Sequence, residues 1–227
     1  MHAVLGVTRG LLVQSGLHFW DYQHLVHLLA KEKGRWRGVA ILHESVTDTE
    51  IGLLDSVGVV GARFYPGVSE LSERQVARVH EVGWGVHILI RGTEQAQAAT
   101  RLLSGTSGTI VIEHAGWQDP AEGTDGSGFR AVLKLLDTGR CWIKLSPRMS
   151  NDVSPPFADT LPVIHALISR APDRMLWGSD WPHPNYFKPM PNDADLFDLL
   201  LDWTSDPDCL RRILVENPTA LFDGADA

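Results

Sequence analysis

The chain has 227 residues, of which 44% are hydrophobic and 21% are charged, and its formal net charge is −8. This composition is typical of a globular protein that is long enough to bury a core of native size. The negative charge, without a long basic cluster, argues against nucleic acid as the main partner. No apolar stretch approaches the roughly 18 residues of a membrane span, so we expect no membrane partner.

The chain has only two cysteines, Cys141 and Cys209, which is too few for a disulfide framework. The N-terminus also lacks the basic and then apolar layout of a signal peptide. We therefore predict a cytoplasmic protein, since thiols persist in a reducing compartment.

Short, almost continuously apolar runs predict strands that are buried on both faces. In chain order they are Leu11–Gln14, Val39–Leu42, Ala62–Tyr65, Val86–Ile90, Thr109–Glu113, Cys141–Ser146 and Met175–Gly178. Segments with helical spacing lie between and after them, at Tyr22–Lys33, Ser72–Val82, Glu94–Leu103, Phe129–Leu136, Leu161–Ser169, Ala194–Trp203 and Asp206–Leu214, and another short helix starts at Asn217. This alternation predicts a parallel sheet with right-handed crossovers.

Cap and turn residues fit these elements. The candidate N-caps are Thr47, Ser72 and Thr93, because each hydroxyl can accept from a first-turn amide. Thr47 with Glu50, and Ser72 with Gln75, also have capping-box spacing. Glycines in the left-handed conformation are expected after helix ends, at Gly34, Gly83, Gly105 and Gly139.

A parallel sheet with helical crossovers is usually either an open doubly wound sheet or a closed eightfold barrel, and the loop lengths distinguish the two. The long loops, Trp117–Ser127, Pro147–Pro156 and Trp181–Pro191, all follow strands. This pattern favours a barrel, whose chemistry lies at that rim, and no glycine-rich nucleotide fingerprint follows the first strand. Seven strands are one fewer than such a barrel needs. We therefore predict an α/β fold of the TIM-type (β/α) barrel class that lacks the first strand, as a single N-terminally incomplete domain over residues 1–227.

The most informative segment runs from Met175 to Pro184, where an apolar strand is followed at once by Gly-Ser-Asp. A carboxylate at the end of a buried strand is costly unless it is paired. Asp180 is therefore predicted to lie at the floor of a pocket. The alternatives are that it caps the next helix or pairs with an arginine.

Other strand ends carry imidazole and cationic groups, as a catalytic rim would. His114 could ligate a metal or polarise a carbonyl, or it could be a core histidine bonded to backbone. Arg63 could clamp a substrate carboxylate or pair with an inner acidic side chain. Arg148 could reach the site from its loop or be solvated at the surface.

Several further residues have weaker signals. His18, beyond the first strand, could reach the pocket, and His183, between prolines, could support the site or form a turn. His87 is expected to be structural. Lys144, in the middle of its strand, is expected to pair with Glu113 or Asp180. Trp117 and Trp181 could wall a pocket. No serine or cysteine has a nucleophile-elbow context, so acyl-enzyme chemistry is not expected.

The motifs Trp177-Gly178-Ser179-Asp180-Trp181-Pro182-His183-Pro184, Ile112-Glu113-His114-Ala115-Gly116 and Lys144-Leu145-Ser146 together resemble the metal-dependent-hydrolase-like amidohydrolase 2 family. Leu12-Val13-Gln14, Gly61-Ala62-Arg63-Phe64 and Asn217-Pro218-Thr219-Ala220-Leu221-Phe222 fit the same pattern. Within the family, the chain is most similar to 2-pyrone-4,6-dicarboxylate lactonases and related lactone hydrolases. The resemblance spans nearly the whole chain, and its motifs are more specific for the family than for a substrate.

The resemblance implies that Asp180 is a general base that activates water and that His114 belongs to the carbonyl-polarising or metal-binding set. It implies that Arg63 and Arg148 hold substrate carboxylates. From their positions in the sequence we also assign His18 and His183 to substrate binding. The cofactor stays open between a divalent ion such as zinc, held by His114 and Asp180, and no metal. The chain departs from the family because it contains no His-x-His, and Leu89 stands where the lactonases tend to have a tyrosine.

We therefore predict a hydrolase for a small carboxylated lactone. One alternative is a metal-dependent non-oxidative decarboxylase of an aromatic or muconate-type acid. Another is an inactive truncated member of the family, whose unpaired sheet edges would favour a homo-oligomer. An upstream reading frame that encodes a strand with His-x-His would indicate a misplaced start.

Overall fold

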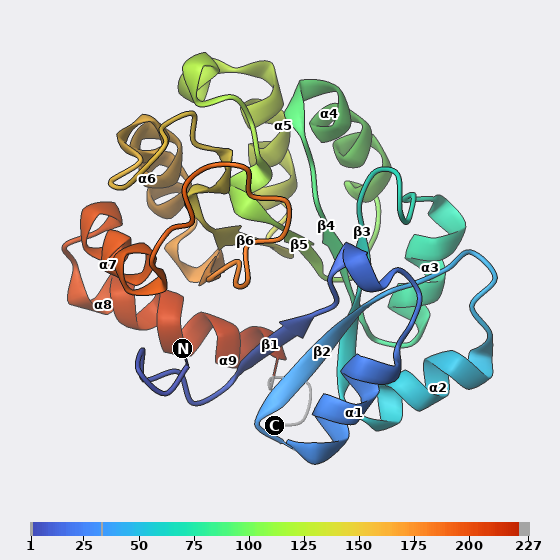
Figure 1. Cartoon of the computed structure of the whole chain (residues 1–227). Helices are drawn as coiled ribbons and strands as arrows, with labels where there is room; N and C mark the ends of the chain where they lie inside the picture. Colours follow the sequence, from blue (N-terminus) through green and yellow to red (C-terminus); the bar gives the residue numbers. More distant parts are fainter. Residues whose placement is uncertain (1, 33, 223–227) are drawn as a thin grey trace. The chain divides into compact units, whose positions relative to one another are not determined.

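The structure, a computed structural model, describes residues 2–32 and 34–222 (Figure 1). Its strands are β1 (Gly10–Val13), β2 (Trp36–Ile41), β3 (Val59–Phe64), β4 (Gly85–Ile88), β5 (Ile110–Ile112), β6 (Cys141–Leu145) and β7 (Met175–Trp177). Its α-helices are α1 (Gln23–Lys31), α2 (Asp48–Ser56), α3 (Glu73–Glu81), α4 (Gly92–Leu103), α5 (Ser127–Leu136), α6 (Leu161–Arg170), α7 (Asp193–Trp203), α8 (Pro207–Arg211) and α9 (Asn217–Phe222). Short 3₁₀ turns are η1 (Gly16–His18), η2 (His114–Gly116), η3 (Pro120–Asp125), η4 (Pro147–Met149), η5 (Ala158–Thr160) and η6 (Pro172–Arg174), and η7 (Arg212–Glu216) is a π-helical turn.

The strands form one sheet in the order β1-β2-β3-β4-β5-β6-β7. The pairings of β1 with β2, β2 with β3, β3 with β4 and β6 with β7 are parallel. All seven predicted strands are confirmed, with ends shifted by at most three residues. A doubly wound sheet reverses its strand order at a switch point, whereas a barrel keeps chain order. The order seen here is that of a barrel-type fold.

Close contacts divide the chain into two compact units. The first unit contains Met1–Leu89 and Thr106–Val111, and the second contains Ile90–Gly105 and Ile112–Ala227. The expectation of a single domain over the whole chain stays a prediction.

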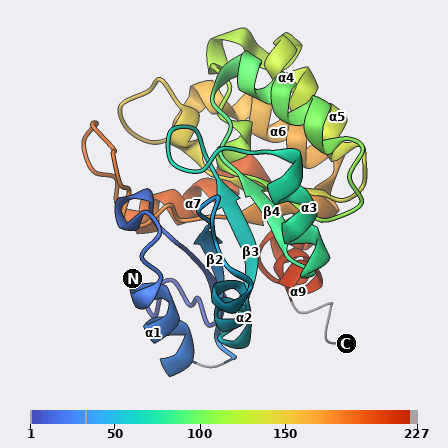
Figure 2. The same ribbon diagram turned by 90° about the vertical axis from the view of Figure 1, so that its right-hand side faces the viewer.

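In the first unit each helix packs against the strand that follows it: α1 on β2, α2 on β3 and α3 on β4. Figure 2 shows α3 beside β4. The apolar faces of these helices bury Leu29, Leu54 and Val79. Gly38 in β2 allows the close approach of α1, because an added Cβ would lie 2.6 Å from the Leu29 Cδ1 atom.

In the second unit α4 lies along α5, as both ribbon views show (Figures 1 and 2). The helix α5 packs on β6, whereas η7 and α9 pack against β7. Phe129, Leu135 and Ile143 are fully buried in this core. The side-chain amide of Asn217 donates to the carbonyl oxygens of Pro172 and Met175, each at 2.8 Å. The start of α9 therefore fixes the start of β7, the strand that leads to Asp180.

The predicted caps are confirmed at two positions. Thr47 and Glu50 form a reciprocal capping box at the start of α2, and the Ser72 hydroxyl accepts from the Gln75 amide at the start of α3. Thr93 was a wrong prediction, because α4 already begins at Gly92. The side chain of Gln95 instead accepts from the Arg91 amide at 2.8 Å, so no threonine cap is needed.

Three of the four predicted helix-terminating glycines, Gly34, Gly83 and Gly139, have positive φ. Gly105 does not, so that prediction was wrong. The helix α4 ends one residue earlier at a right-handed Ser104, whose hydroxyl donates to the Thr100 carbonyl oxygen at 2.6 Å. This bond ends the helix without a left-handed residue. Within residues 2–32 and 34–222, no helix is both long enough and apolar enough to cross a bilayer.

Candidate active site

Four of the predicted site residues converge in the second unit. His114 follows β5, Arg148 lies in η4 after β6, and Asp180 and His183 lie in the segment after β7. The carboxyl ends of successive parallel strands thus bring together groups that are far apart in the sequence. All four side chains are at most 16% exposed. This cluster is the candidate active site.

The two oxygens of Asp180 have different surroundings. Oδ2 accepts a hydrogen bond of 2.8 Å from Arg148 Nη1 and lies 3.5 Å from His183 Nδ1. Oδ1 faces His114 Nε2 at 3.7 Å. The alternative that Asp180 pairs with an arginine is therefore correct, and the pairing also offsets the cost of placing this charge at the end of a buried strand.

Arg148 is directed into the site, and the surface-solvated interpretation was wrong. Its side chain is only 8% exposed. Besides Asp180, it donates from Nη2 to the carbonyl oxygen of Pro184. Its guanidinium carbon lies 4.9 Å from the centre of the Tyr186 ring and 5.7 Å from that of Trp117, distances at which cation–π attraction operates. The η4 turn begins two residues after β6 and so keeps Arg148 at the carboxyl end of that strand.

The imidazole of His114 is held on two sides. Its Nδ1 lies 2.8 Å from the Ser146 hydroxyl, and its ring meets the Trp117 ring edge-on at a centroid distance of 5.4 Å. These contacts turn Nε2 toward Asp180. Gly116 allows close packing beside this histidine. It has φ +81°, and an added Cβ would lie 2.8 Å from Val132, so it lets η2 lie close to α5.

Backbone strain concentrates at this cluster. Eight described non-glycine residues have positive φ, and six of them lie in the two segments 114–117 and 180–185. His114, Asp180 and His183 have φ values of 51°, 59° and 58°. Each such conformation costs on the order of 1–3 kcal/mol and persists only where the surroundings fix it. Strain of this kind is more common at functional sites than in ordinary loops.

Two members of the cluster were not predicted from the sequence. Asp193 Oδ1 lies 3.3 Å from His183 Nε2, so the buried imidazole is flanked by two carboxylates. In the sequence, Asp193 looks like an ordinary first-turn acid of α7, after the Asn192 cap. Tyr186 covers Arg148 from within the long loop after β7. Burial raises the pKa of Tyr186, Arg148 opposes this, and Asp180 adds to it, so the phenol stays protonated near neutral pH.

The remaining candidates have mainly structural contacts. Lys144 Nζ donates to Glu113 Oε1 at 3.3 Å, one of the two pairings that were predicted. His87 is 1% exposed, and its ring lies against Gly61, where an added Cβ would come within 2.7 Å. The structural role expected of His87 stays a prediction. Trp181 is 58% exposed, whereas Trp117 contacts the site.

Arg63 and His18 belong to the first unit and have contacts there. Arg63 Nη1 donates to the Gln14 carbonyl oxygen at 3.3 Å, and its guanidinium lies 5.0 Å from the Tyr65 ring centre. His18 is exposed in η1, where its ring stacks on His24 at 5.5 Å. Their predicted contact with substrate stays a prediction.

A metal fits the described residues poorly. A catalytic zinc takes about three protein ligands. His114 and Asp180 supply two donors, but the second oxygen of Asp180 is held by the cationic Arg148. No group of three or more His, Cys, Asp or Glu side chains with suitable spacing exists among residues 2–32 and 34–222. The described residues therefore give no support for a catalytic step through a metal.

A parallel sheet in chain order, with charged groups at the carboxyl ends of its strands, is the arrangement of a TIM-type (β/α) barrel enzyme, of which the described residues supply seven strands. The comparison with protein families agrees. The family described as "Amidohydrolase" matches residues 1–224, and the chain belongs to this family. It is accordingly an enzyme of the hydrolase class.

Characterised relatives and solved structures support this assignment. The chain is 34% identical to 4-sulfomuconolactone hydrolase of Hydrogenophaga intermedia, over 96% of this chain and 75% of the relative. It is 32% identical to D-galactarolactone isomerase of Agrobacterium fabrum, over 96% of this chain and 77% of the relative. An apo crystal structure of an Agrobacterium tumefaciens protein has a TM-score of 0.84 and 30% identity, over 98% of this chain and 82% of that chain.

Proposed function

We propose that this enzyme hydrolyses a small carboxylated lactone, with water activated by Asp180. One observation carries the proposal: the two carboxylate oxygens of Asp180 have different partners. Arg148 holds Oδ2, whereas Oδ1 is directed toward His114 without a hydrogen bond that the structure describes. A general base must be held in one orientation and still keep a lone pair free for the proton it takes. Oδ1 meets both conditions.

The proposed reaction has two steps. In the first, the water oxygen attacks the lactone carbonyl carbon while its proton passes to Asp180 Oδ1, which gives a tetrahedral oxyanion. In the second, the bond between the carbonyl carbon and the ring oxygen breaks, and Asp180 returns the proton to the departing oxygen. The ring opens to a carboxylic acid and a hydroxyl group, and Asp180 ends the cycle as a carboxylate.

His114 is the proposed partner of the oxyanion. Its Nε2 faces a carboxylate, which favours a hydrogen on this nitrogen, and the Ser146 hydroxyl can then donate to Nδ1. An Nε2–H group fixed in this way can donate to the developing negative charge. Such a donor is effective because the ring is already oriented before the reaction begins.

Arginines are the proposed anchors of the substrate carboxylates. Arg148 uses two of its nitrogens on Asp180 and Pro184, which leaves other guanidinium N–H groups for a ligand. We also assign Arg63, His18 and His183 to substrate binding. The support is that Arg63 lies near the carboxyl end of β3 and that His18 follows β1, since ligands of this fold class bind at the carboxyl ends of the strands.

The relatives support the substrate class. Two 4-sulfomuconolactone hydrolases are each 34% identical to this chain, and a 2-pyrone-4,6-dicarboxylate hydrolase of Comamonas testosteroni is 29% identical. The substrates after which these relatives are named are all lactones that bear an acidic group. For this enzyme we propose only the feature that these substrates share, a small anionic lactone, and no single compound.

Lactone isomerisation is the second candidate, because a D-galactarolactone isomerase is 32% identical over nearly the whole chain. The same base could remove a proton from a hydroxyl group of the substrate, which would then attack the carbonyl in place of water. No new residue is required, so the two reactions differ only in the nucleophile.

Product analysis with labelled water separates these reactions. The wild-type enzyme is incubated with a panel of carboxylated lactones in H₂¹⁸O, and the masses of the products are measured by mass spectrometry. Hydrolysis places one ¹⁸O in a ring-opened acid, whereas isomerisation gives an unlabelled lactone. Carbon dioxide release, measured together with the metal content, would instead identify a decarboxylase. Failure of the whole panel to react would remove the proposed function.

We also propose that the enzyme is cytoplasmic and forms a homo-oligomer. A cytoplasmic location is supported by Cys141 and Cys209, which are both buried and unpaired with each other. Size measurement by light scattering would test the proposed homo-oligomer.

A further inference from the structure

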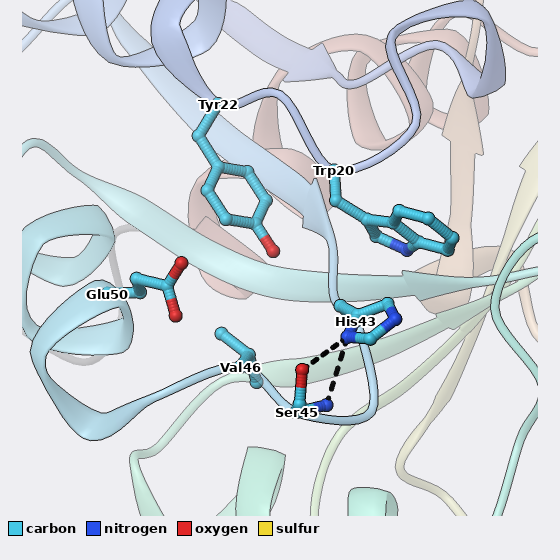
Figure 3. Close-up of a pocket in the computed structure, with 6 residues that line it drawn as sticks. All are labelled: Trp20, Tyr22, His43, Ser45, Val46 and Glu50. Atoms are coloured by element: carbon cyan, nitrogen blue, oxygen red, sulfur yellow. Dashed lines mark hydrogen bonds between the residues drawn. The ribbon is translucent and has the colours of Figure 1, made fainter.

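The first unit contains a small cavity to which the proposed hydrolysis assigns no role (Figure 3). It measures about 230 Å³ and is lined by Trp20, Tyr22, His43, Ser45, Val46 and Glu50. Trp20 and Tyr22 lie in the segment between β1 and α1, and the other residues lie between β2 and the first turn of α2. Segments that follow adjacent parallel strands are a preferred place for ligand sites in α/β proteins.

Aromatic rings form one corner of the cavity. The rings of Trp20 and His43 meet edge to face, with centroids 4.5 Å apart and an interplanar angle of 77°. Trp20 is nevertheless 42% exposed, so part of its indole is open to a ligand. An accessible tryptophan beside polar groups suits a ligand ring whose C–H groups can pack on the indole and whose O–H groups can bind the polar neighbours.

His43 is held in one orientation and presents a donor. Its Nδ1 accepts from the Ser45 amide at 3.1 Å and lies 2.6 Å from the Ser45 hydroxyl. Because a backbone amide can only donate, Nδ1 must be an acceptor, and the hydrogen of the neutral ring is on Nε2. Figure 3 shows this second nitrogen on the side of the ring away from Ser45, below Trp20.

Tyr22 adds a second donor. Its hydroxyl oxygen is buried, and no acceptor for its proton is described. Burial raises the pKa of Tyr22, the His43 backbone amide opposes this, and Glu50 raises it further, so the group stays an O–H donor. Figure 3 shows the hydroxyl pointing between the Trp20, His43 and Glu50 side chains. A buried hydroxyl proton without an acceptor is costly, and a bound ligand with an acceptor oxygen would remove that cost.

Glu50 supplies an acceptor. Its Oε2 accepts from the Thr47 amide at 2.7 Å and from the Thr47 hydroxyl at 2.8 Å. These two bonds lower the pKa of Glu50, so it is a carboxylate at neutral pH. Oε1 has no described hydrogen bond and can accept from a ligand. None of the six described residues that line the cavity is a lysine or an arginine, and the nearby Arg78 donates to the Val46 carbonyl oxygen and to Asp48.

The charge and hydrogen-bonding pattern selects among ligand classes. A carboxylated ligand would face the Glu50 charge without a cation to bind it, and an organic cation would face two N–H or O–H donors. A hydroxyl group satisfies both kinds of partner, because it accepts from Tyr22 or His43 and donates to Glu50. We propose that this cavity binds a neutral polyhydroxylated ring, of the monosaccharide or cyclitol class, as a second ligand site.

Protein-observed NMR titration tests the proposal, with methyl β-D-glucopyranoside as the probe and choline and acetate as charged comparators. We expect saturable binding of the glucoside with a Kd of about 1–10 mM, because the cavity is small and partly open. Choline and acetate should bind at least about tenfold more weakly. The experiment needs no lactone, so its result does not depend on the proposed hydrolysis.

Two variants locate the binding. Tyr22→Phe removes one oxygen without changing the ring, and it should weaken binding about three- to tenfold through the lost hydrogen bond. Trp20→Ala should weaken it at least about tenfold. The matched controls are Glu44→Gln, an exposed neighbour outside the cavity, and Phe187→Ala, a 94% exposed aromatic residue of the second unit, and both should bind as the wild type does.

Three results would overturn the proposal. One is the absence of saturable glucoside binding up to about 100 mM, well above the expected range. Another is choline or acetate binding as tightly as the glucoside. The third is an unchanged Kd in Tyr22→Phe, which thermal unfolding can show to be folded even if Trp20→Ala is not.

Discussion

The candidate active site around Asp180 and the cavity around Trp20 both lie in segments that follow parallel strands, but their physical chemistry differs. In the cluster, charged groups are buried and paired, and His114, Asp180 and His183 have left-handed backbones. The cavity is open, has one exposed carboxylate, and has no positive φ among its six lining residues. Buried charge and strain must be maintained against a cost, and for this reason we propose the Asp180 site, rather than the cavity, as the catalytic one. An open, unstrained cavity needs only to bind.

Loss of the Asp180 carboxylate should have the largest effect. Asp180→Asn keeps the shape and the contact with Arg148 but cannot take a proton. We expect kcat for lactone hydrolysis to fall by about 10²–10⁴, the usual contribution of a general base. Asp195→Asn, an exposed first-turn position of α7, is the control and should leave kcat unchanged. Similar rates for the two variants would place the chemistry elsewhere.

Arg148→Lys should have the next largest effect. Lysine keeps the charge but cannot bridge Asp180 and the Pro184 carbonyl with a planar fork. We expect kcat to fall about 10- to 100-fold, as is usual for the loss of charge-assisted hydrogen bonds. Arg130→Lys on the exposed face of α5 controls for the change in residue type. A variant as active as the wild type would show that Asp180 does not need this partner.

The two units can also be compared at glycines with the same φ of +81°. Gly116→Ala introduces both left-handed strain and a Cβ 2.8 Å from Val132, whereas Gly67→Ala in the first unit introduces the strain alone. We expect losses in unfolding free energy of about 2–4 kcal/mol and about 1 kcal/mol, measured by urea denaturation. Equal losses would mean that η2 and α5 do not need their close approach.

The smallest effect concerns stability at high pH. Burial raises the pKa of both Tyr22 and Tyr186 in the folded state. As pH rises through the unfolded value near about 10, the unfolded chain releases these protons first, so stability is full below this pH and falls above it. Tyr22→Phe and Tyr186→Phe should each make this decline shallower, as measured by Tm between about pH 9 and 11. A decline as steep as that of the wild type in both variants would exclude the two phenols as its cause.

The fold could be predicted well because its signals are local. Apolar runs such as Val39–Leu42 define buried strands wherever they occur, and Thr47 with Glu50 defines a helix start from four consecutive residues. The failures at Thr93 and Gly105 are also local. In each case another side chain bonds a backbone group at the helix end: Gln95 accepts from the Arg91 amide, and Ser104 donates to the Thr100 carbonyl oxygen.

The site was only partly predictable, because pairing depends on distances that the sequence does not contain. Asp180 and His114 were identified from their places after apolar strands. The contact of Arg148 with Asp180 was one of several open alternatives, since a loop arginine can point either way. Asp193 could not be distinguished from an ordinary helix-start acid, and nothing in the pattern around Tyr186 indicates that its ring covers a guanidinium.

Chemical rescue tests the role of Asp180 most directly. Asp180→Gly removes the carboxylate, and glycine tolerates the φ of 59° at this position, so the backbone should keep its course. We predict that lactone hydrolysis by this variant is severely reduced and that added formate restores it at least about tenfold in a saturable manner, since formate can occupy the vacated space and act as the base. Chloride at equal ionic strength should restore nothing. Hydrolysis by Asp180→Gly at the wild-type rate, or a low rate that formate does not raise, would contradict the assignment of Asp180 as the base.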